Sequence, residues 1–351
     1  MKRFIMLISM LLIIKIVISQ SCFPNGIVFQ SQSSVDSYAL TYPNCTEIEG
    51  YLAITGDDIT NLDSLYIITK VNYNLFINNT SKLLDISGLS NLNSVGSIFI
   101  IQDNEMLTNL DGLDNVTSVG DHMVINSNPS LISISSLNSL ISVEGGLSIT
   151  NNVMLTDLSG LTNITSIGGD VKIVNNKVLQ SIHELNNLET LLGNIVIGDN
   201  ALVSLNGLTN IIGSSVRNIY IAYNPSLSEC DVLGICDYLT DPAGDAIVSF
   251  NSVNCNSRLE VEEACGIIGI NNNSNKSIIS ISPNPATDKI FISYDDNKTV
   301  ELINIYSQTG SKVYSTDNIN TGISVATFNP GLYIIEIITN GLKIREKLII
   351  L

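Results

Sequence analysis

A repeat of 24 residues constrains this 351-residue chain more than any other feature. Asparagine recurs at that step, and an isoleucine stands three residues before each asparagine of the column. The column consists of Asn104, Asn128, Asn152, Asn176, Asn200 and Asn224. Columns of leucine keep the same step until one residue is missing between Leu185 and Leu208. Self-similarity at a fixed step of this size is typical of chains whose repeats stack on one another.

Each repeat predicts one short strand, for example Phe99–Ile101, whose alternate side chains point inward. One repeat cannot bury its own apolar face, but stacked repeats make a continuous core. We expect the asparagine column to bond to exposed backbone at the turns, as a structural ladder and not as a set of ligand residues. Gly96, Gly120, Gly168 and Gly193 precede the strands, where either a positive φ or a close backbone approach is expected. The repeat thus predicts a mainly β, leucine-rich solenoid.

The start of this region carries a family resemblance. Residues 44–54, NCTEIEGYLAI, resemble the opening of the receptor L-domain family, and residues 113–120, LDNVTSVG, are similar to its bacterial members. The resemblance covers roughly Cys22 to Cys265 and implies a right-handed leucine-rich solenoid, known from ligand-binding parts of growth-factor receptors and from bacterial surface proteins. It implies a fold and not a ligand.

Both ends of the solenoid, residues 20–265, need caps that cover apolar surface. At the front we expect a short helix from Ser33 to Tyr42. The sequence has an even number of cysteines, which in an exported protein favours disulfides over zinc, and neither pair of later cysteines has C-x-x-C spacing. Cys22 and Cys45 are close enough to pair, and the connectivity of the others stays open. The six cysteines are Cys22, Cys45, Cys230, Cys236, Cys255 and Cys265.

Residues 1–19 are typical of a secretory signal peptide, with Lys2 and Arg3 before an apolar run and cleavage expected after Ser19. An uncleaved membrane anchor is less favoured, because the run is short and contains Lys15. A lipid anchor on Cys22 is less favoured still. No membrane insertion is expected after the signal is removed.

Acidic residues are concentrated in the repeats. Cys22 to Cys265 holds 26 acidic and six basic residues, a net charge of −20, whereas the rest of the chain from Gly266 is balanced at seven of each. Such a surface repels nucleic acid and anionic membranes, so neither is expected as a partner. Solubility alone also explains the charge.

The pattern changes after Cys265. Residues 266–278 form a polar linker, and from Ile279 the apolar period becomes two, which predicts a small antiparallel β-sandwich over residues 279–351. Thr309-Gly310 and Asn340-Gly341 are expected turns, the latter favoured in hairpins. Residues 282–286 (SPNPA), 330–334 (PGLYI) and 347–349 (KLI) resemble the C-terminal sorting domain of the type IX secretion system. The resemblance implies a member of the Bacteroidota, contact with the type IX machinery, and a secreted or outer-surface location.

No catalytic motif is apparent in the sequence. His122 and His183 fall in different registers of the repeat, and neither has a nucleophile, acid or metal ligand beside it in a recognisable motif. Residues 57–58 and 103–105 offer carboxylates to a calcium ion but lack a spaced ligand series, so solvated turns are the better interpretation. We therefore expect no enzyme activity, no metal and no cofactor.

The outward strand positions vary from repeat to repeat, and solenoids usually present binding surfaces in this way. The candidate ligand face consists of Ile98, Ile100, His122, Val124, Lys172 and Tyr220. This favours a secreted or surface recognition and adhesion protein that binds a protein or a polysaccharide. A sugar site normally contains flat aromatic rings, whereas the chain has no Trp and Tyr220 stands nearly alone on this face. A structural component of the cell envelope or biofilm matrix is the alternative, and absence of constraint also explains the variation.

Overall fold

The computed structural model describes residues 20–242, 244–267, 279–294, 300–307, 311–317, 322–339 and 342–351. The chain divides into two compact units between Val261 and Glu262, named here the repeat unit and the C-terminal unit. The predicted signal peptide, residues 268–278 of the predicted linker, and the predicted turns at Thr309-Gly310 and Asn340-Gly341 lie outside the described residues.

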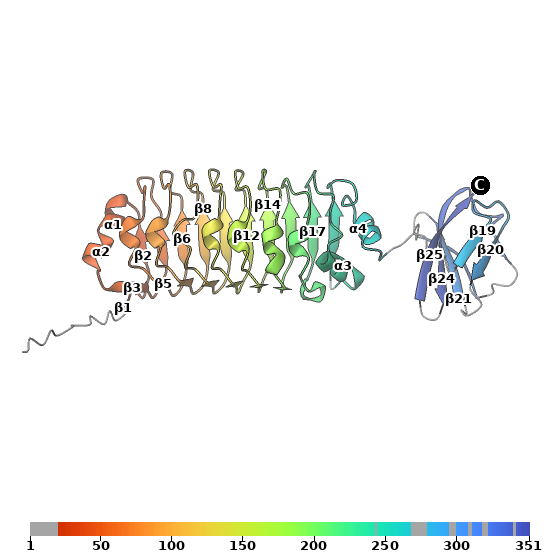
Figure 1. Ribbon diagram of the computed structural model, residues 1–351, viewed down its shortest axis with the longest axis horizontal. Helices are drawn as coiled ribbons and strands as arrows, with labels where there is room; N and C mark the ends of the chain where they lie inside the picture. The colour runs from red at the N-terminus through yellow and green to blue at the C-terminus, as the bar shows by residue number, and fades with distance from the viewer. Residues whose placement is uncertain are drawn as a thin grey trace, which may run out of the picture. The chain divides into compact units, whose positions relative to one another are not determined.

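The described part of the repeat unit contains a parallel sheet of ten strands, in which neighbouring strands come from successive repeats (Figure 1). In the strands between Leu75 and Ala222, each residue pairs with the residue 24 positions further along, as Met123 does with Leu147. The strand predicted at Phe99–Ile101 extends to Gln102. The strands are β2 (Ile27–Phe29), β4 (Leu52–Ile54), β6 (Leu75–Asn78), β8 (Phe99–Gln102), β10 (Met123–Asn126), β12 (Leu147–Thr150), β14 (Val171–Val174), β16 (Ile195–Gly198), β17 (Ile219–Ala222) and β18 (Ala246–Ser249).

A second parallel sheet, with eight described strands, contains the dipeptides that precede the strands of the ten-stranded sheet. Sequence reasoning did not predict it, because six of these strands have only two residues, too few to show an alternating pattern. Its strands are β1 (Gln20–Cys22), β3 (Cys45–Ile48), β5 (Lys70–Val71), β7 (Ser94–Val95), β9 (Ser118–Val119), β11 (Ser142–Val143), β13 (Ser166–Ile167) and β15 (Thr190–Leu191).

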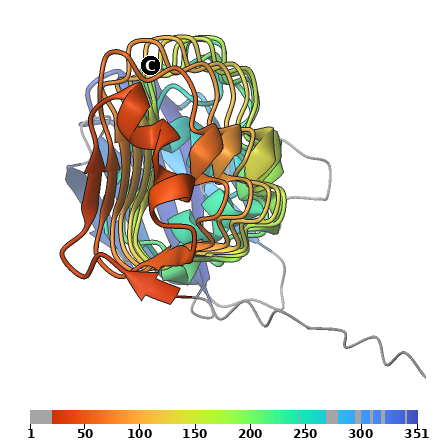
Figure 2. The ribbon, with the colours of Figure 1, turned by 90° about the vertical axis from the view of Figure 1, so that its left-hand side faces the viewer.

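Short 3-10 helices lie on the return path of most repeats. Figure 2, a view from the end that carries the N-terminal helices, shows successive repeats lying behind one another. The helices are η1 (Asp63–Leu65), η2 (Ser87–Leu89), η3 (Ser135–Leu137), η4 (Ser159–Leu161), η5 (His183–Asn187), η6 (Asn206–Leu208) and η7 (Gly213–Ser215).

Leucine and isoleucine side chains fill the interior between the two sheets and the 3-10 helices. In the repeat that begins at β8, Phe99, Ile101 and Leu107 are all fully buried. The glycines before the strands allow close backbone approach: a Cβ on Gly120 would collide with the carbonyl oxygen of Gly96. None of the four predicted glycines has a positive φ, so close approach is the reason that applies.

Two short helices cover the first repeat, α1 (Gln32–Asp36) and α2 (Tyr38–Thr41), where a single helix from Ser33 to Tyr42 was predicted. The backbone N–H of Ser37 caps α1, and α2 starts at the next residue. A helix of this length needs tertiary contacts for its stability, so packing of the cap overrides the local pattern.

Aromatic packing and a disulfide complete this front cap. Tyr38 is buried, with its ring edge-on to Phe29 at a centroid distance of 5.5 Å. Its hydroxyl donates a hydrogen bond to the carbonyl oxygen of Cys45 at 3.0 Å. Cys45 also forms a disulfide with Cys22. The cap therefore joins the first strands of both sheets.

The last repeats are covered by α3 (Leu233–Thr240) and α4 (Arg258–Ala264). Cys230 pairs with Cys255 across 25 residues, with a Cα–Cα distance of 5.7 Å. Cys236 and Cys265 are also disulfide-bonded and make the third pair, since the other four cysteines are joined to one another. This is the connectivity that sequence reasoning left open.

From Ile279 onward, the described part of the C-terminal unit consists of antiparallel strands and their connections. One sheet has the order β19-β20-β23 and the other β22-β21-β24-β25. Ile290, Ile305 and Ile335 are among the buried residues of its core. The strands are β19 (Ile279–Ser282), β20 (Lys289–Tyr294), β21 (Val300–Ser307), β22 (Lys312–Thr316), β23 (Ile323–Ser324), β24 (Gly331–Thr339) and β25 (Leu342–Ile350).

Candidate functional site

The outward positions of the ten-stranded sheet alternate with buried ones. In β14, Val171 and Ile173 are buried, and Lys172 between them is exposed. The candidate ligand face divides into exposed residues, His122 and Lys172, and half-buried residues, Ile98, Ile100, Val124 and Tyr220. Gly146, which stands one repeat of 24 residues after His122, is buried. The column that contains His122 is therefore not uniformly exposed.

The asparagine column forms a buried ladder of side-chain hydrogen bonds. The side-chain Nδ2 of Asn104 donates to Oδ1 of Asn128 at 3.0 Å and to the carbonyl oxygen of Ile77 at 3.0 Å. The backbone N–H of Asn104 donates to the same Oδ1 at 3.2 Å. The ladder continues through Asn152, Asn176 and Asn200 to Asn224. These side chains satisfy buried backbone groups in the interior of the repeat unit.

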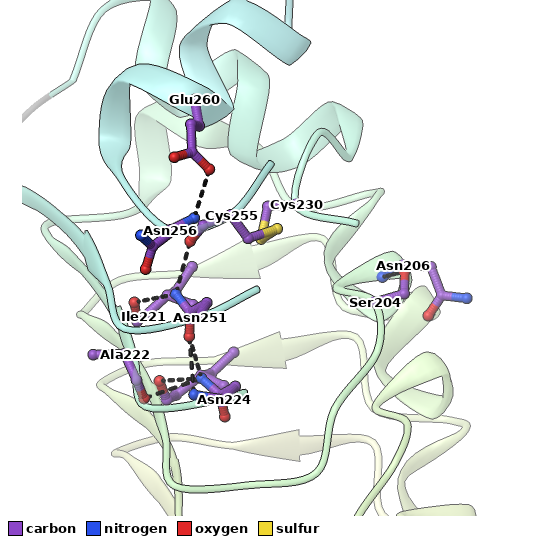
Figure 3. Close-up of a disulfide and its surroundings, with 11 residues drawn as sticks. Ser204, Asn206, Ile221, Ala222, Asn224, Cys230, Asn251, Cys255, Asn256 and Glu260 are labelled. Carbon is purple, nitrogen blue, oxygen red and sulfur yellow. Dashed lines mark hydrogen bonds between the residues drawn. A yellow bond between two sulfur atoms is a disulfide. The ribbon is translucent and has the colours of Figure 1, made fainter. Parts of the chain in front are cut away.

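The ladder has two further members outside the repeated asparagine column. Thr80 donates its hydroxyl to Oδ1 of Asn104 at 2.6 Å at the front. At the back, Nδ2 of Asn224 donates to Oδ1 of Asn251 at 3.1 Å, close to the Cys230–Cys255 disulfide (Figure 3). Asn251 escaped sequence reasoning because it stands 27 residues after Asn224 and so breaks the step of the column.

A left-handed backbone precedes every member of the ladder. We call these residues the turn column; their φ angles run from 54° to 61°. Asparagine and aspartate adopt this conformation more readily than other residues with a side chain. The turn column consists of Asn79, Asp103, Ser127, Asn151, Asn175, Asp199, Tyr223 and Phe250. Its enrichment in Asn and Asp was a signal in the sequence that could have revealed it.

Two shallow hollows lie along the turn column. The first, of about 410 Å³, is lined by Asp57, Asn79, Ser81, Asp103, Glu105, Ser127, Pro129, Asn151 and Val153. The second, of about 390 Å³, is lined by Lys177, Asp199, Asn200, Ala201, Tyr223, Pro225, Ser226 and Phe250. Neither hollow includes a residue of the candidate ligand face.

The second hollow contains a pair of stacked aromatic rings. Tyr223 and Phe250 lie parallel within 6°, with their ring centroids 4.8 Å apart. Both are exposed, at 55% and 62% of their full surface. Beside them the ammonium of Lys177 pairs with the carboxylate of Asp199 at 3.4 Å. Sequence reasoning missed this aromatic pair, because the step between its members is that of β17 and β18 and not that of the repeat.

Each described histidine contacts a carboxylate near it in the chain. His122 Nδ1 lies 2.6 Å from Asp121, and both side chains are largely exposed. His183 Nδ1 lies 2.9 Å from the hydroxyl of Ser181 and 3.3 Å from Glu184. Serine and carboxylate approach the same ring nitrogen, whereas in a Ser-His-acid triad they contact opposite nitrogens.

The acidic turns give no sign of a calcium site in the described residues. Asp57, Asp103 and Glu105 line the open first hollow. No group of three or more His, Cys, Asp or Glu side chains that could hold a metal is found among the residues that the structure describes.

The two end motifs of the C-terminal unit meet in space. Asn284 accepts the backbone N–H of Ile349 at 2.9 Å and donates its Nδ2 to the carbonyl oxygen of Lys347 at 2.6 Å. Ala286 and Leu351 add two backbone hydrogen bonds at the same place. The SPNPA segment therefore anchors β25.

Residues 280–351 match the family model described as "Secretion system C-terminal sorting domain". The C-terminal unit carries a type IX secretion sorting domain. This sorting domain implies contact with the type IX machinery and export across the outer membrane, to the cell surface or beyond it. A comparison with curated proteins gives no match. Among the described residues, no helix has the length and apolar character needed to span a membrane.

Proposed function

We propose that this protein is a non-catalytic recognition protein, delivered to the cell surface or the surroundings by type IX secretion. Its repeat unit, in this proposal, is a right-handed leucine-rich solenoid of the receptor L-domain type that binds an extracellular protein or polysaccharide. The L-domain-like segment 44–54 and the parallel pairing of successive repeats support this assignment.

The contrast between the two sides of the ten-stranded sheet carries the proposal. Inward residues of the central strands are apolar and buried, as Val171 and Ile173 are in β14. Outward residues differ in charge, size and shape between repeats, from Val124 to Lys172 to Tyr220. A sheet with a constant core side and a variable solvent side presents an extended surface that can be complementary to one partner.

The arrangement of the histidines supports a role without catalysis. His122 is an exposed side chain with a carboxylate neighbour, and His183 has both of its polar neighbours on one ring nitrogen. Neither arrangement supplies a nucleophile with a base that is oriented by a third group.

A binding screen with paired variants tests the proposal. The full chain, purified with its disulfides intact, is assayed against surface proteins and polysaccharides beside the double variant Lys172→Glu with Tyr220→Ala. The matched control, Lys82→Glu with Tyr66→Ala, makes the same chemical changes at exposed positions outside the candidate ligand face. Binding that is lost in the first double variant and kept in the control supports recognition through the sheet.

Two other results would redirect the proposal. Binding that survives both double variants keeps recognition and moves the site off the sheet. Absence of any binding, together with a particle mass that rises with concentration, favours the alternative of an envelope or matrix component.

A further inference from the structure

The second hollow has two features that the stability of the fold does not require. The first is backbone conformation: Tyr223 and Phe250 hold φ at 61° and 55°. Bulky side chains in the left-handed region are outliers that cost free energy, and such residues cluster at functional sites. Earlier repeats use Asn, Asp or Ser in the turn column, so the fold does not require an aromatic residue there.

A third aromatic residue with a positive φ, Phe23, lies at the other end of the repeat unit, and its ring is packed against other side chains. Phe23 has a φ of 55°, and its ring packs in the front cap at 4.9 Å from the ring of Tyr42. Tyr223 and Phe250 instead leave more than half of their surface in solvent. Their rings therefore form a flat apolar surface that faces water.

The second feature is a shortened turn. In the neighbouring repeats the next buried leucine stands three positions after the ladder asparagine, as Leu179 does after Asn176 and Leu227 after Asn224. Between Asn200 and Leu202 the separation is two, which places the missing residue of the repeat here. Only Ala201 remains between them, and it lines the hollow beside Tyr223. The deletion and the small side chain leave room next to the ring.

The polar side chains around the second hollow supply both hydrogen-bond donors and hydrogen-bond acceptors. Lys177 and Asp199 form an exposed ion pair, so their charges offset one another locally. Ser226 adds a hydroxyl. A polyhydroxylated ring can stack its C–H face on the aromatic ring and exchange hydrogen bonds with these groups, as concave sites with a few placed polar groups do.

The charge and extent of the turn column narrow the class of ligand. The net charge of −20 between Cys22 and Cys265 repels a polyanion. The first hollow lies along the same column over earlier repeats, and Asp103, Ser127 and Asn151 are among the residues that line it. A linear chain can follow such a row, with one repeat advancing about 4.8 Å along the sheet.

We propose that Tyr223 and Phe250 form the anchor of a binding site for a neutral polysaccharide, whose chain runs along the turn column. This inference rests on one part of the proposed function, the binding of an extracellular partner by the repeat unit, and gives that binding a ligand class and a site. It locates the anchor on the turns at the ends of β17 and β18, rather than on the outward residues of the sheet.

Asparagine substitutions test the anchor without disturbing the turns. In Tyr223→Asn with Phe250→Asn, each ring is replaced by the residue found at Asn79, Asn151 and Asn175 of the same column. Ala201→Lys fills the hollow and leaves both rings in place. Tyr66→Ala removes an exposed ring elsewhere and serves as the control. The full chain and its variants are titrated calorimetrically with soluble glucan, mannan and xylan, with an anionic polysaccharide for comparison.

We expect one neutral polysaccharide to bind, with affinity about tenfold weaker in the Asn double variant and in Ala201→Lys, since losing one anchor contact costs that much. Tyr66→Ala should bind as the parent does. The double variant Lys172→Glu with Tyr220→Ala tests the sheet face separately: loss of binding only in this variant would overturn this inference and leave the proposed function standing. Binding of the anionic polysaccharide alone would also overturn it. Should the Asn double variant not fold, Ala201→Lys decides the question.

Discussion

Asn284 accepts the backbone N–H of Ile349 at 2.9 Å, across 65 residues of chain. Its Nδ2 donates to the carbonyl oxygen of Lys347, so one side chain holds the last strand at two points. The two motifs that resemble the ends of a sorting domain are therefore parts of one structural feature.

Asn284→Ala should destabilise the C-terminal unit by about 1–3 kcal/mol, because two hydrogen bonds to β25 are lost. We expect faster proteolysis of this unit and a lower yield of exported protein in a host with type IX secretion. Lys289→Ala, which removes an exposed side chain nearby in the sequence, is the control. Equal protease resistance of both variants would contradict the anchoring role.

Asn152→Ala should break the ladder in the middle of the repeat unit. The change removes the acceptor of Asn128 N–H and the donor to the carbonyl oxygen of Ile125, both buried. Unsatisfied buried groups of this kind cost about 2–4 kcal/mol in total. Urea unfolding measures the loss, and Asn138→Ala, at an exposed position, should change stability by less than about 0.5 kcal/mol.

Gly120→Ala should destabilise the repeat unit more than the addition of a single methyl group suggests. The added Cβ collides with the backbone carbonyl oxygen of Gly96, which cannot move without separating two paired repeats. We expect a loss of at least about 2 kcal/mol in thermal or urea unfolding. Gly198→Ala is the matched control, because its Cβ would meet only the carbonyl oxygen of Ala222, at 3.0 Å. An equal effect of both changes would refute the close-approach explanation.

Removing the Cys230–Cys255 disulfide should lower stability by about 3 kcal/mol, the usual value for a loop of this size. The same loop holds Asn251, whose Nδ2 donates to the carbonyl oxygens of Ile221 and Cys255, both at 2.9 Å. The variant is Cys230→Ser with Cys255→Ser, compared with the parent by urea unfolding without reductant. An unchanged midpoint would show that α3, α4 and the third disulfide suffice to close this end.

Stability should fall in alkali because of Tyr38. Burial, and secondarily the neighbouring Tyr42, raises the pKa of the Tyr38 hydroxyl well above its usual value. Below about pH 10 the hydroxyl is protonated in both states, and above it the unfolded chain releases the proton first. The folded state then loses up to about 1.4 kcal/mol per pH unit until its own pKa is reached.

Tyr38→Phe checks this assignment. The variant loses the hydrogen bond to Cys45, at a cost of about 1 kcal/mol at neutral pH, and should show a shallower decline above about pH 10. Tyr238, whose pKa burial also raises, remains in both proteins and contributes equally. Parallel alkaline declines of variant and parent would exclude Tyr38 as the group responsible.

Period and burial were predictable from the sequence alone. Because stacking places each residue beside its equivalent 24 positions away, a constant column such as Asn104, Asn128 and Asn152 is adjacent in space. For the same reason the inward columns, including Phe99 and Met123, become the core. The C-terminal strands followed from their period of two, and the sorting resemblance from short motifs.

Tertiary structure decided what the period does not encode. Tyr223 meets Phe250 across a step of 27 residues because β18 pairs with β17 after an irregular connection, which no repeat count reveals. Asn284 meets Ile349 because two sheets close on one core. The third disulfide joins Cys236 in α3 to Cys265 just after α4, a pairing that the repeat does not encode. Contacts between unlike residues at irregular separations depend on packing of the whole chain, whereas contacts within a column depend only on its step.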